Sequence, residues 1–385
     1  MAHILRVLLK QYPLVSITGP RQSGKTTLSH LACQGYKYIN MEIDEFKEFA
    51  EKDPGGFLEK YKGKVILDEA QSVPSLFPYL QYLTDKRKIK GEYVLSGSKN
   101  FLLMEKISES LAGRIAILNL LPFSIDELWP YLKPKQRSLH SLIQRGFYPR
   151  LVNDKKMSSR IFYSSYIKTY VEKDLRSLLN VQNVRTFQQF IKMCAARAGS
   201  IFNSLDIGTQ LGIDHKTVKY WISVLETSYI IYLHPSYYKN YDKRILKKPK
   251  IYFYDTGFLC YLLGIHSSDE LQDHPLYGHI FENFILIEYL KDHYNKGFNP
   301  ELYYWRDSNN REVDLIVEQN NITHFCEIKS NPSVYSEDFK NLELLKTLSK
   351  SQNQKCITKL INTGTDSYTR EGHEVQSWLW FAKLK

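Results

Sequence analysis

A glycine-rich octapeptide near the start of the chain restricts the possible folds more than any other stretch. Residues 19–26 read GPRQSGKT, which fits the pattern G-x-x-x-x-G-K-[ST] at each fixed position. The preceding LVSIT is apolar and β-prone, and the following TTLSHLA is compatible with a helix. A strand, a phosphate-binding loop and a helix in this order predict a parallel α/β sheet of the P-loop NTPase class.

The residue types in the octapeptide suit a bound triphosphate. Gly19 and Gly24 permit the backbone angles that turn N–H groups towards phosphates, and Lys25 would place its charge between the β- and γ-phosphates. Thr26 would bind Mg²⁺ through its hydroxyl. We therefore expect ATP and Mg²⁺ as ligands, with a chance match as the alternative. The predicted nucleotide contacts are Gly19, Pro20, Arg21, Gln22, Ser23, Gly24, Lys25, Thr26 and Thr27.

A second motif, KVILDEAQ at residues 64–71, is an apolar strand that ends in two acids. Unpaired carboxylates at the end of a buried strand are costly, so a metal ion and a water molecule would explain them. Asp68 is predicted to hold Mg²⁺, and Glu69 to orient and deprotonate the attacking water. Two exposed acids at a strand end are the alternative interpretation.

Two further residues are candidates for assisting hydrolysis. The stretch YVLSGS ends an apolar strand, and either Ser96 or Ser98 could contact the attacking water or the γ-phosphate; we favour Ser98. Arg114, in SLAGRIAIL, could neutralise developing charge in cis or across a subunit interface, as an arginine finger does. A structural salt bridge explains Arg114 equally well.

The composition of the chain indicates what kind of binding partner and which cellular compartment to expect. The 385 residues include 52 Lys plus Arg against 41 Asp plus Glu, a formal net charge of +11, with 28 Tyr. This excess suits a phosphate-rich partner, although ordinary solubilising charge also explains it. The five cysteines are scattered, which argues against disulfides and zinc. No run is long enough to cross a membrane and the N-terminal segment is unlike a signal peptide, so a cytoplasmic protein without a membrane partner is expected.

The middle of the chain has the spacing of a helix-turn-helix. Within NSLDIGTQLGIDHKTVKYWISVLETSYII we predict helices at 204–211 and 215–226, joined by a turn at 212–214. A following Tyr- and Lys-rich stretch resembles a DNA-contacting wing. A winged helix used only for protein contacts is the alternative. The predicted DNA contacts are Lys216, Lys219, Lys243, Arg244, Lys247 and Lys248.

The C-terminal region carries an acid–lysine pattern. EVDLIVEQNNITHFCEIKS predicts a β-hairpin that turns near residues 320–321. Asp314 would lie on its first strand, and Glu327 and Lys329 would share one face of the second. With Glu282 from the preceding helix, this arrangement is typical of a Mg²⁺ site in restriction-endonuclease-like folds. Solvated cross-strand partners are the alternative.

These motifs in combination resemble the prokaryotic AAA-type ATPases that carry a C-terminal domain of unknown function. The resemblance rests on GPRQSGKTTL, LDEAQ, LSGS, LAGR and LPFSIDEL, and continues in YVEKDLR, YFYDTGFLCYLLG, GHIFENFIL, YYWRD, EVDLIV and CEIKS. It implies an ATP-binding fold, a winged-helix-like middle and a nuclease-like C-terminal fold. One departure is RGFYPR at residues 145–150, where such proteins tend to have a second glycine and an acidic end.

We therefore expect four segments: an AAA-type P-loop core at 1–125, a helical lid at 126–188, a winged-helix-like domain at 189–268 and a restriction-endonuclease-like domain at 269–385. The expected function is Mg²⁺-dependent ATP hydrolysis coupled to DNA binding by the C-terminal half. One alternative is a signalling ATPase whose C-terminal half holds protein partners. The other is an ATP-regulated Mg²⁺-dependent DNA nuclease. An oligomer is compatible with either.

Overall fold

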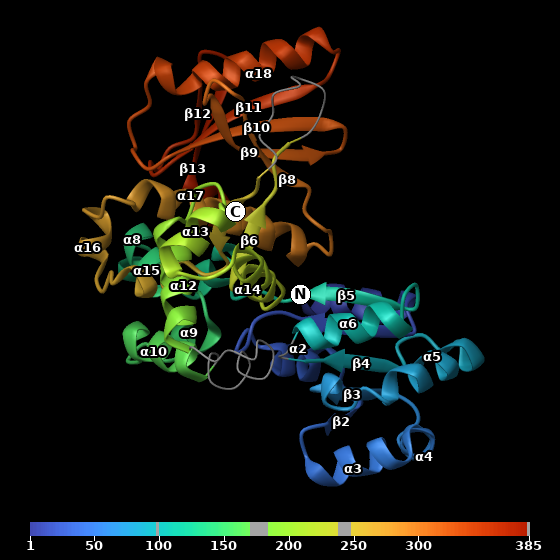
Figure 1. The fold of residues 1–385 in the computed structure, drawn as a ribbon. Helices are drawn as coiled ribbons and strands as arrows, with labels where there is room; N and C mark the ends of the chain where they lie inside the picture. The colour runs from blue at the N-terminus through green and yellow to red at the C-terminus, as the bar shows by residue number, and fades with distance from the viewer. Residues whose placement is uncertain (98–99, 170–183, 238–247, 383–385) are drawn as a thin grey trace. The chain divides into compact units, whose positions relative to one another are not determined.

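The computed structural model describes residues 1–97, 100–169, 184–237 and 248–382 (Figure 1). The chain forms two compact units. The N-terminal unit consists of Met1–Pro122, Thr227–Tyr229 and Asp292–Asn299, and the C-terminal unit of Phe123–Glu226, Ile230–Lys291 and Pro300–Lys385. Among the described residues, no helix is both long and apolar enough to cross a membrane. All five cysteines are free thiols.

A five-stranded parallel sheet forms the centre of the N-terminal unit. Its strands are β1 (Leu14–Thr18), β2 (Lys37–Asn40), β3 (Val65–Asp68), β4 (Tyr93–Ser96) and β5 (Ile115–Asn119). Their order is β2-β3-β4-β1-β5, so β4 lies between β1 and β3. Each predicted strand of residues 1–125 is confirmed, and so is the parallel α/β class.

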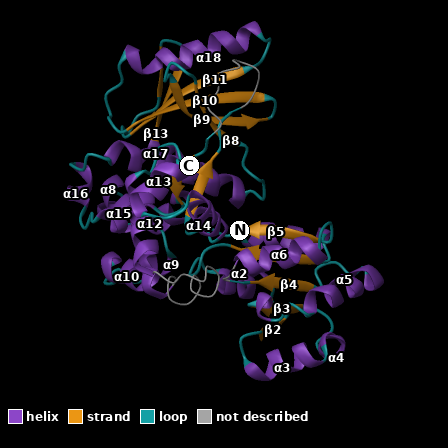
Figure 2. Cartoon of the chain, viewed as in Figure 1, coloured by secondary structure: helices purple, strands orange, loops and turns teal. Residues whose placement is uncertain are grey.

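Helices cover both faces of this sheet, because alternate strand residues point to opposite sides. Figure 2 distinguishes the strands of this sheet from the helices around it. Val15, Ile66 and Val94 pack against two helices on one face, whereas Leu14 and Leu67 belong to a separate apolar cluster on the other face. The first face is covered by α1 (Ala2–Gln11) and α2 (Lys25–Ala32). The second is covered by α3 (Asp44–Lys52), α4 (Pro54–Lys60), α5 (Leu76–Arg87) and α6 (Asn100–Ser110).

The C-terminal unit begins with a helical region. Its helices are α7 (Ile125–Leu128), α8 (Leu139–Arg145), α9 (Pro149–Asn153), α10 (Ser159–Thr169), α12 (Val184–Ala196), α13 (Ser204–Leu211), α14 (His215–Thr227), α15 (Thr256–Leu263), α16 (Ser268–Gln272) and α17 (Tyr277–Asn295). The predicted helix-turn-helix boundaries are confirmed to within one residue at α13 and α14. Asn203 accepts hydrogen bonds from two backbone N–H groups at the start of α13, and Gly212 ends this helix in the left-handed conformation. A short antiparallel pair, β6 (Ile231–His234) and β7 (Lys250–Phe253), follows α14.

A mixed six-stranded sheet completes the C-terminal unit. Its strands are β8 (Leu302–Arg306), β9 (Glu312–Gln319), β10 (Ile322–Lys329), β11 (Cys356–Asn362), β12 (Tyr368–Arg370) and β13 (His373–Ser377), in the order β12-β13-β11-β10-β9-β8. Helix α18 (Lys340–Ser351) lies along one face and contributes Leu342 and Leu345 to the core (Figure 1).

The predicted hairpin between β9 and β10 is confirmed. Gln319 pairs with Ile322, so the loop consists of Asn320 and Asn321 alone. Both asparagines have positive φ, 52° and 60°. Two left-handed residues in a two-residue loop match the right-handed twist of the flanking strands and set the register of the hairpin.

Candidate nucleotide-binding and acidic sites

The loop of residues 19–24 joins β1 to α2 in a conformation that depends on glycine. Gly19 has φ 146° and Gly24 has φ 98°. A Cβ atom at Gly19 would lie 2.0 Å from the carbonyl oxygen of Leu120, so no other residue fits there without movement of the backbone. Gln22 is also left-handed, with φ 61°. The loop therefore has the strand–loop–helix context that the sequence predicts.

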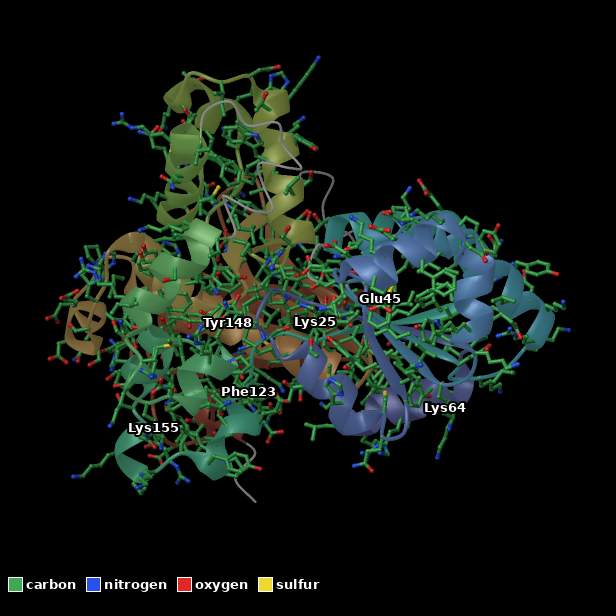
Figure 3. The ribbon with its side chains drawn as sticks, turned by 90° about the horizontal axis from the view of Figure 1, so that it is seen from below. Lys25, Glu45, Lys64, Phe123, Tyr148 and Lys155 are labelled. Carbon is green, nitrogen blue, oxygen red and sulfur yellow. The ribbon has the colours of Figure 1, made fainter. Side chains whose placement is uncertain are left out.

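Lys25, labelled in Figure 3, begins α2, and its ammonium group is turned into the loop. Its Nζ donates hydrogen bonds to the carbonyl oxygens of Gly19 at 2.9 Å and Pro20 at 2.8 Å. Burial lowers the pKa of Lys25 to about 8. The hydroxyl of Ser23, also in the loop, is buried and has no hydrogen-bond partner in the described structure. The loop thus holds a buried cation and an unused hydroxyl where phosphate oxygens are expected.

Asp68 accepts hydrogen bonds from hydroxyl groups on three elements. Its Oδ2 accepts from Thr26 at 3.1 Å and from Tyr38 at 2.6 Å, and its Oδ1 accepts from Ser96 at 2.5 Å. The strand order explains this convergence, because the carboxyl ends of adjacent parallel strands meet at one edge of the sheet. Within the described part of the chain, no basic side chain forms an ion pair with Asp68. A carboxylate surrounded by hydroxyl oxygens suits a hard divalent cation such as Mg²⁺.

Glu69 follows Asp68 in a left-handed conformation with φ 54°. This conformation is uncommon for a residue with a Cβ and occurs often at functional sites. The carboxylate accepts a hydrogen bond of 2.5 Å from the amide nitrogen of Gln71. The other amide atom, Oε1 of Gln71, is buried and has no partner among the described residues. A Cβ at Gly97 would approach that oxygen to 2.1 Å, so the glycine leaves room for the Gln71 side chain.

The structure describes only one of the two residues predicted to assist hydrolysis. Ser98 lies outside the described residues, whereas Ser96 contacts Asp68. Arg114 forms a two-point ion pair with Asp85, at 2.6 Å from Nε and 2.9 Å from Nη2. The register pairs Ile115 with Leu14, so Arg114 lies at the sheet edge opposite the phosphate loop. The strand length alone separates these edges by about 13 Å.

This position bears on the alternatives that the sequence left open for Arg114. The prediction left open whether its guanidinium acts on the nucleotide of its own chain. In the conformation described here, the guanidinium is engaged by Asp85 at the far edge of the sheet, so the salt-bridge interpretation holds within the chain. An action on a neighbouring subunit stays a prediction.

The predicted DNA-contacting residues are described only in part. Lys216 lies in the first turn of α14, where the backbone N–H of Lys216 donates to Asp214 at 3.3 Å. Lys219, one turn later, and Lys248 line the same hollow of about 400 Å³. Its other lining residues are Phe202, Asn203, Ser204, Leu205, His215 and Pro249. The predicted contacts Lys243, Arg244 and Lys247 lie outside the described residues.

The hairpin brings the C-terminal acids together. Leu315 pairs with Cys326, so Asp314 and Glu327 are the next residues in register. Asp314 accepts a hydrogen bond of 2.8 Å from the backbone N–H of Ile328, and Lys329 donates to Glu327 at 2.8 Å. Burial raises the pKa of Glu327 to about 7 although Lys329 opposes the shift. One carboxylate oxygen of Glu327, Oε2, is buried and without a partner among the described residues.

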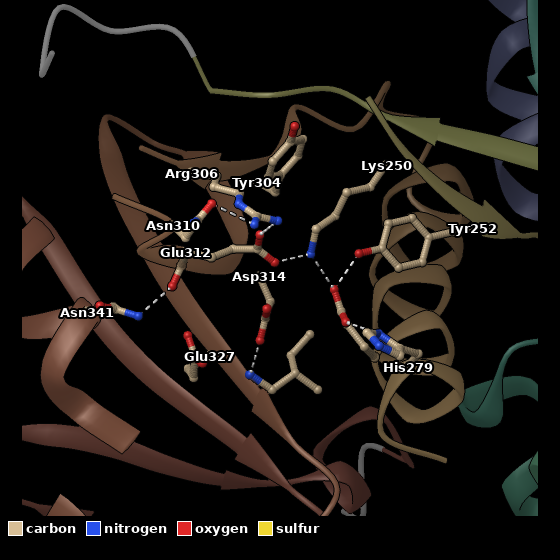
Figure 4. Close-up of polar contacts among 12 residues, drawn as sticks. Lys250, Tyr252, His279, Tyr304, Arg306, Asn310, Glu312, Asp314, Glu327 and Asn341 are labelled. Atoms are coloured by element: carbon tan, nitrogen blue, oxygen red, sulfur yellow. Dashed lines mark hydrogen bonds and ion pairs between the residues drawn. The ribbon is translucent and has the colours of Figure 1, made fainter. Parts of the chain in front are cut away.

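Glu282 has partners other than this pair, among them Lys250 and Tyr252, which are labelled in Figure 4. Its Oε1 accepts a hydrogen bond of 3.0 Å from Lys250 and another from Tyr252. Burial opposes ionisation, but the charge of Lys250 and the hydrogen bonds from His279, Tyr252 and Lys250 together lower the pKa of Glu282 to about 2. Lys250 also forms an ion pair with Glu312. Lys250, from β7, therefore supplies the positive charge between these two acids.

This arrangement corrects the prediction that Glu282 completes a metal cluster with Asp314 and Glu327. Throughout the described ranges, no group of three His, Cys, Asp or Glu side chains is arranged to hold a metal ion. Glu282 does not join such a group because the ammonium group of Lys250 already neutralises its carboxylate. Asp314, Glu327 and Lys329 do lie together as predicted.

Several residues of these sites were missed in the sequence. Tyr38 belongs to the short strand YKYIN, and the sequence does not distinguish it from an ordinary core residue, although its hydroxyl donates to Asp68. Gln71 follows the two acids in LDEAQ, and its position within that motif was an available signal. Lys250 and Glu312 carried no signal, because they are 62 residues apart and only the folded chain joins them.

Comparisons with known proteins give the family. Family models match an AAA domain at residues 11–129, a domain of unknown function (DUF8612) at 136–269 and a second domain of unknown function (DUF4143) at 277–381. The chain is 31% identical over 341 residues to the uncharacterized proteins Rv2008c of Mycobacterium tuberculosis and Mb2031c of Mycobacterium bovis. Each alignment covers 86% of this chain and 74% of the relative.

Solved structures that match the chain include the Walker-type ATPase paby2304 of Pyrococcus abyssi, at 17% identity and a TM-score of 0.48. That match covers 68% of this chain and 94% of the other. A RuvB variant of Thermotoga maritima matches at 15% identity and a TM-score of 0.31, covering 60% and 88%. Both TM-scores are below 0.5 and add nothing to the assignment. The chain belongs to the family of the two mycobacterial proteins, and its AAA domain makes it a P-loop ATPase.

Proposed function

We propose that the chain hydrolyses ATP at the loop of residues 19–27 and uses the nucleotide state to control DNA binding by its C-terminal half. The observation that carries the first part is the hydrogen bond of 3.1 Å between Thr26 and Asp68. It brings the end of the phosphate loop to the acid at the end of β3. In a P-loop ATPase, these two positions flank the terminal phosphates.

The loop residues bind and orient the nucleotide. Backbone N–H groups of residues 19–24 and the N-terminus of α2 would face the phosphate oxygens. Lys25 would leave the carbonyl oxygens of Gly19 and Pro20 and donate to the β- and γ-phosphates. Arg21, Gln22, Ser23 and Thr27 complete the proposed set of contacts.

The hydroxyl of Thr26 and the carboxylate of Asp68 offer the oxygen donors that Mg²⁺ prefers. When bound, Mg²⁺ would neutralise charge on the phosphate oxygens. Glu69 would hold the attacking water and accept its proton as the water oxygen bonds to the γ-phosphorus and the bond to ADP breaks. The hydrogen bond from Gln71 would keep the Glu69 carboxylate oriented before ATP binds.

The experiment that tests the ATPase proposal is turnover of ATP by the full chain with and without Mg²⁺. Activity in the wild type that needs Mg²⁺ and disappears in Lys25→Ala would support the site. Equal activity in wild type and variant would place hydrolysis elsewhere.

We infer DNA binding from the basic hollow on the helix-turn-helix. Lys219 of α14 and Lys248 line one hollow, and Lys216 lies one turn earlier on the same helix. A second helix with basic residues in its first turns is the usual groove-contacting element of a helix-turn-helix. Under this proposal, residues 126–188 serve as a helical lid, residues 189–268 as a winged-helix-like domain and residues 269–385 as a restriction-endonuclease-like domain.

Salt dependence separates DNA binding from the alternative in which these domains hold protein partners. We expect the affinity for duplex DNA to fall linearly with salt on logarithmic axes. The pair Lys216→Ala/Lys219→Ala should weaken binding and reduce the slope, whereas Lys350→Ala, on α18, should leave both unchanged. No measurable DNA affinity at low salt would favour the signalling ATPase. ATP turnover with and without DNA then measures the coupling.

A DNA nuclease is the second candidate. It is supported by the pair Asp314 and Glu327, with Lys329 on the same strand face and one carboxylate oxygen of Glu327 unpaired. Those two carboxylates would hold a metal ion, and Lys329 would stabilise charge on the phosphate under attack. Cleavage of DNA with Mg²⁺ or Mn²⁺ that is lost in Asp314→Ala would support it. Cleavage that persists in the variant would indicate a contaminant.

A further inference from the structure

A cavity of about 730 Å³ lies within the first helices of the C-terminal unit, and its lining includes no residue of the nucleotide loop or of the acidic pair. It is formed by residues 123–155, which include α7, α8 and α9. Two of its lining residues, Phe123 and Lys155, are labelled in Figure 3. The volume is within the range of pockets that bind small molecules. Neither proposed activity uses this cavity.

The floor of the cavity is apolar. Leu128, Leu142 and Leu151 are buried and contribute to its lining, together with Phe123 and Val152. The three leucines come from α7, α8 and α9, and their burial in the core of the unit sets their positions. An apolar ligand body would displace water from this floor with a gain in free energy.

The charged part of the lining is mainly cationic. Three cations, Lys135, Arg145 and Lys155, line the cavity with a single acid, Glu127. The Glu127 carboxylate accepts hydrogen bonds from the backbone N–H of Ser124 at 3.0 Å and from its hydroxyl at 3.3 Å. This acid is thus engaged in the capping box that begins α7.

The cations are held by neutral groups. Arg145 donates to the carbonyl oxygens of Leu151 at 2.8 Å and Asp154 at 3.0 Å, and Lys155 donates to the side-chain oxygen of Gln136 at 3.2 Å. Among the residues that the structure describes, neither these two cations nor Lys135 forms an ion pair with an acid. The hydrogen bonds orient Arg145 and Lys155 but leave their charges available to a ligand.

We propose that this cavity binds a small amphipathic anion, with its apolar body on the leucine floor and a carboxylate, sulfonate or phosphate at the three cations. A neutral apolar molecule would fill the floor and leave the cations unpaired. A simple ion would pair with the cations and leave the floor in contact with water. Charge and apolar surface together therefore select a ligand that carries both.

A pair of fluorescent probes tests the proposal on the full chain. The anion 8-anilinonaphthalene-1-sulfonate and the neutral N-phenyl-1-naphthylamine share the same ring system. We expect one saturable site for the sulfonate. The double variant Lys135→Gln/Lys155→Gln should weaken sulfonate binding roughly fivefold to tenfold, since each exposed ion pair contributes modestly. It should leave binding of the neutral probe unchanged.

The matched control is Lys133→Gln/Lys156→Gln, which removes two exposed lysines close in sequence that do not line the cavity. It should bind both probes like the wild type. Val152→Phe should block both probes by filling the cavity, and its circular dichroism spectrum and melting temperature show whether the chain is folded. Octanoate and octyl phosphate should displace the sulfonate probe, whereas octanol should not, and the stronger competitor identifies the preferred head group.

Several results would overturn the proposal. They are the absence of saturable sulfonate binding, an equal loss in the control variant, or an equal loss of the neutral probe in Lys135→Gln/Lys155→Gln. Unchanged sulfonate binding in a folded Val152→Phe chain would place the probe elsewhere. Displacement by octanol as strong as by octanoate would show that charge plays no part.

Discussion

The hydroxyl of Thr26 lies 3.1 Å from a carboxylate oxygen of Asp68, although 42 residues separate them in the chain. Thr26 lies in the first turn of α2 and Asp68 is the last residue of β3. Strand β4 separates β1 from β3, and Ser96 at its end donates to the same acid. The strand order thus brings together the side chains of the proposed magnesium site.

Lys25→Ala should abolish ATP turnover without unfolding the chain. The ammonium group of Lys25 is buried and donates only to loop carbonyl oxygens in the described structure, so its removal breaks no ion pair. We expect turnover to fall at least about 100-fold, since a charged donor to the transferred phosphoryl group is lost. The measurement is phosphate release, with the melting temperature as the folding check. Lys90→Ala, at an exposed position, should match the wild type.

Affinity for ATP should fall above pH 8. Burial lowers the pKa of Lys25 to about 8 in the free loop, and only the protonated form can donate to the phosphates. Bound phosphates favour the protonated form, so binding above pH 8 takes up a proton. At pH 9 we expect affinity roughly tenfold below its value at pH 7, measured by titration with a fluorescent ATP analogue. A flat profile up to pH 9.5 would contradict the proposed role.

Glu69→Gln should separate ATP binding from hydrolysis. The variant keeps the shape of the side chain at its left-handed position but cannot accept a proton from water. We expect turnover to fall about 100-fold or more, while ATP affinity stays within about threefold. Single-turnover kinetics and nucleotide binding measure the two effects separately. Glu51→Gln, an exposed exchange of the same type on α3, is the control.

Arg114→Ala tests action between subunits. Because Arg114 lies at the opposite sheet edge from the loop of its own chain, loss of the side chain should not change turnover in dilute, monomeric protein. If the arginine serves a neighbouring nucleotide, turnover per subunit of the wild type should rise with protein concentration, and the variant should not show this rise. Equal concentration dependence in both would leave Arg114 with a structural role only.

Lys250→Met should destabilise the chain in a pH-dependent way. Removal of this lysine leaves Glu282 and Glu312 without their shared cation, a change that typically costs about 3–5 kcal/mol for a buried ion pair. In the wild type, Lys250 lowers the pKa of Glu282, so the stabilisation is present above pH 4.5 and is lost as the pH falls towards 2.

In the Lys250→Met variant, burial would raise the pKa of Glu282 instead, and protonation would relieve the unpaired charge. The difference in unfolding free energy between wild type and variant should therefore shrink from pH 7 to pH 5. Mn²⁺ should raise the melting temperature of the variant more than that of the wild type, because the ion can replace the missing cation. Lys248→Met, at an exposed neighbouring position, should show neither effect.

Local patterns in the sequence predicted most of the fold and the centre of the nucleotide site. The strand ends at Thr18 and Asp68 and the turn at Asn320 follow from residue types within a few positions of one another. These features depend on local backbone preference and on the alternation of apolar residues. They could therefore be predicted without knowledge of the tertiary structure.

The residues that escaped prediction owe their roles to distant partners. Tyr38 reaches Asp68 only because β2 pairs with β3, and Arg114 meets Asp85 across 29 residues of sequence. From the sequence alone, Lys250 is interpreted as a basic surface residue. Its hydrogen bond to Glu282 forms only because β7 lies beside α17 in the folded chain. Contacts set by sheet order and helix packing leave no local signature in the chain.

The bond between Lys250 and Glu282 also has a consequence for how this protein can be divided. Lys250 belongs to the segment matched by one family model and Glu282 to the segment matched by the next. If either segment were expressed separately, a buried ionised group, Lys250 or Glu282, would lose its ion-pair partner. Any truncation or transfer to another protein should therefore keep the two segments together. We expect evolution to have retained them together as well.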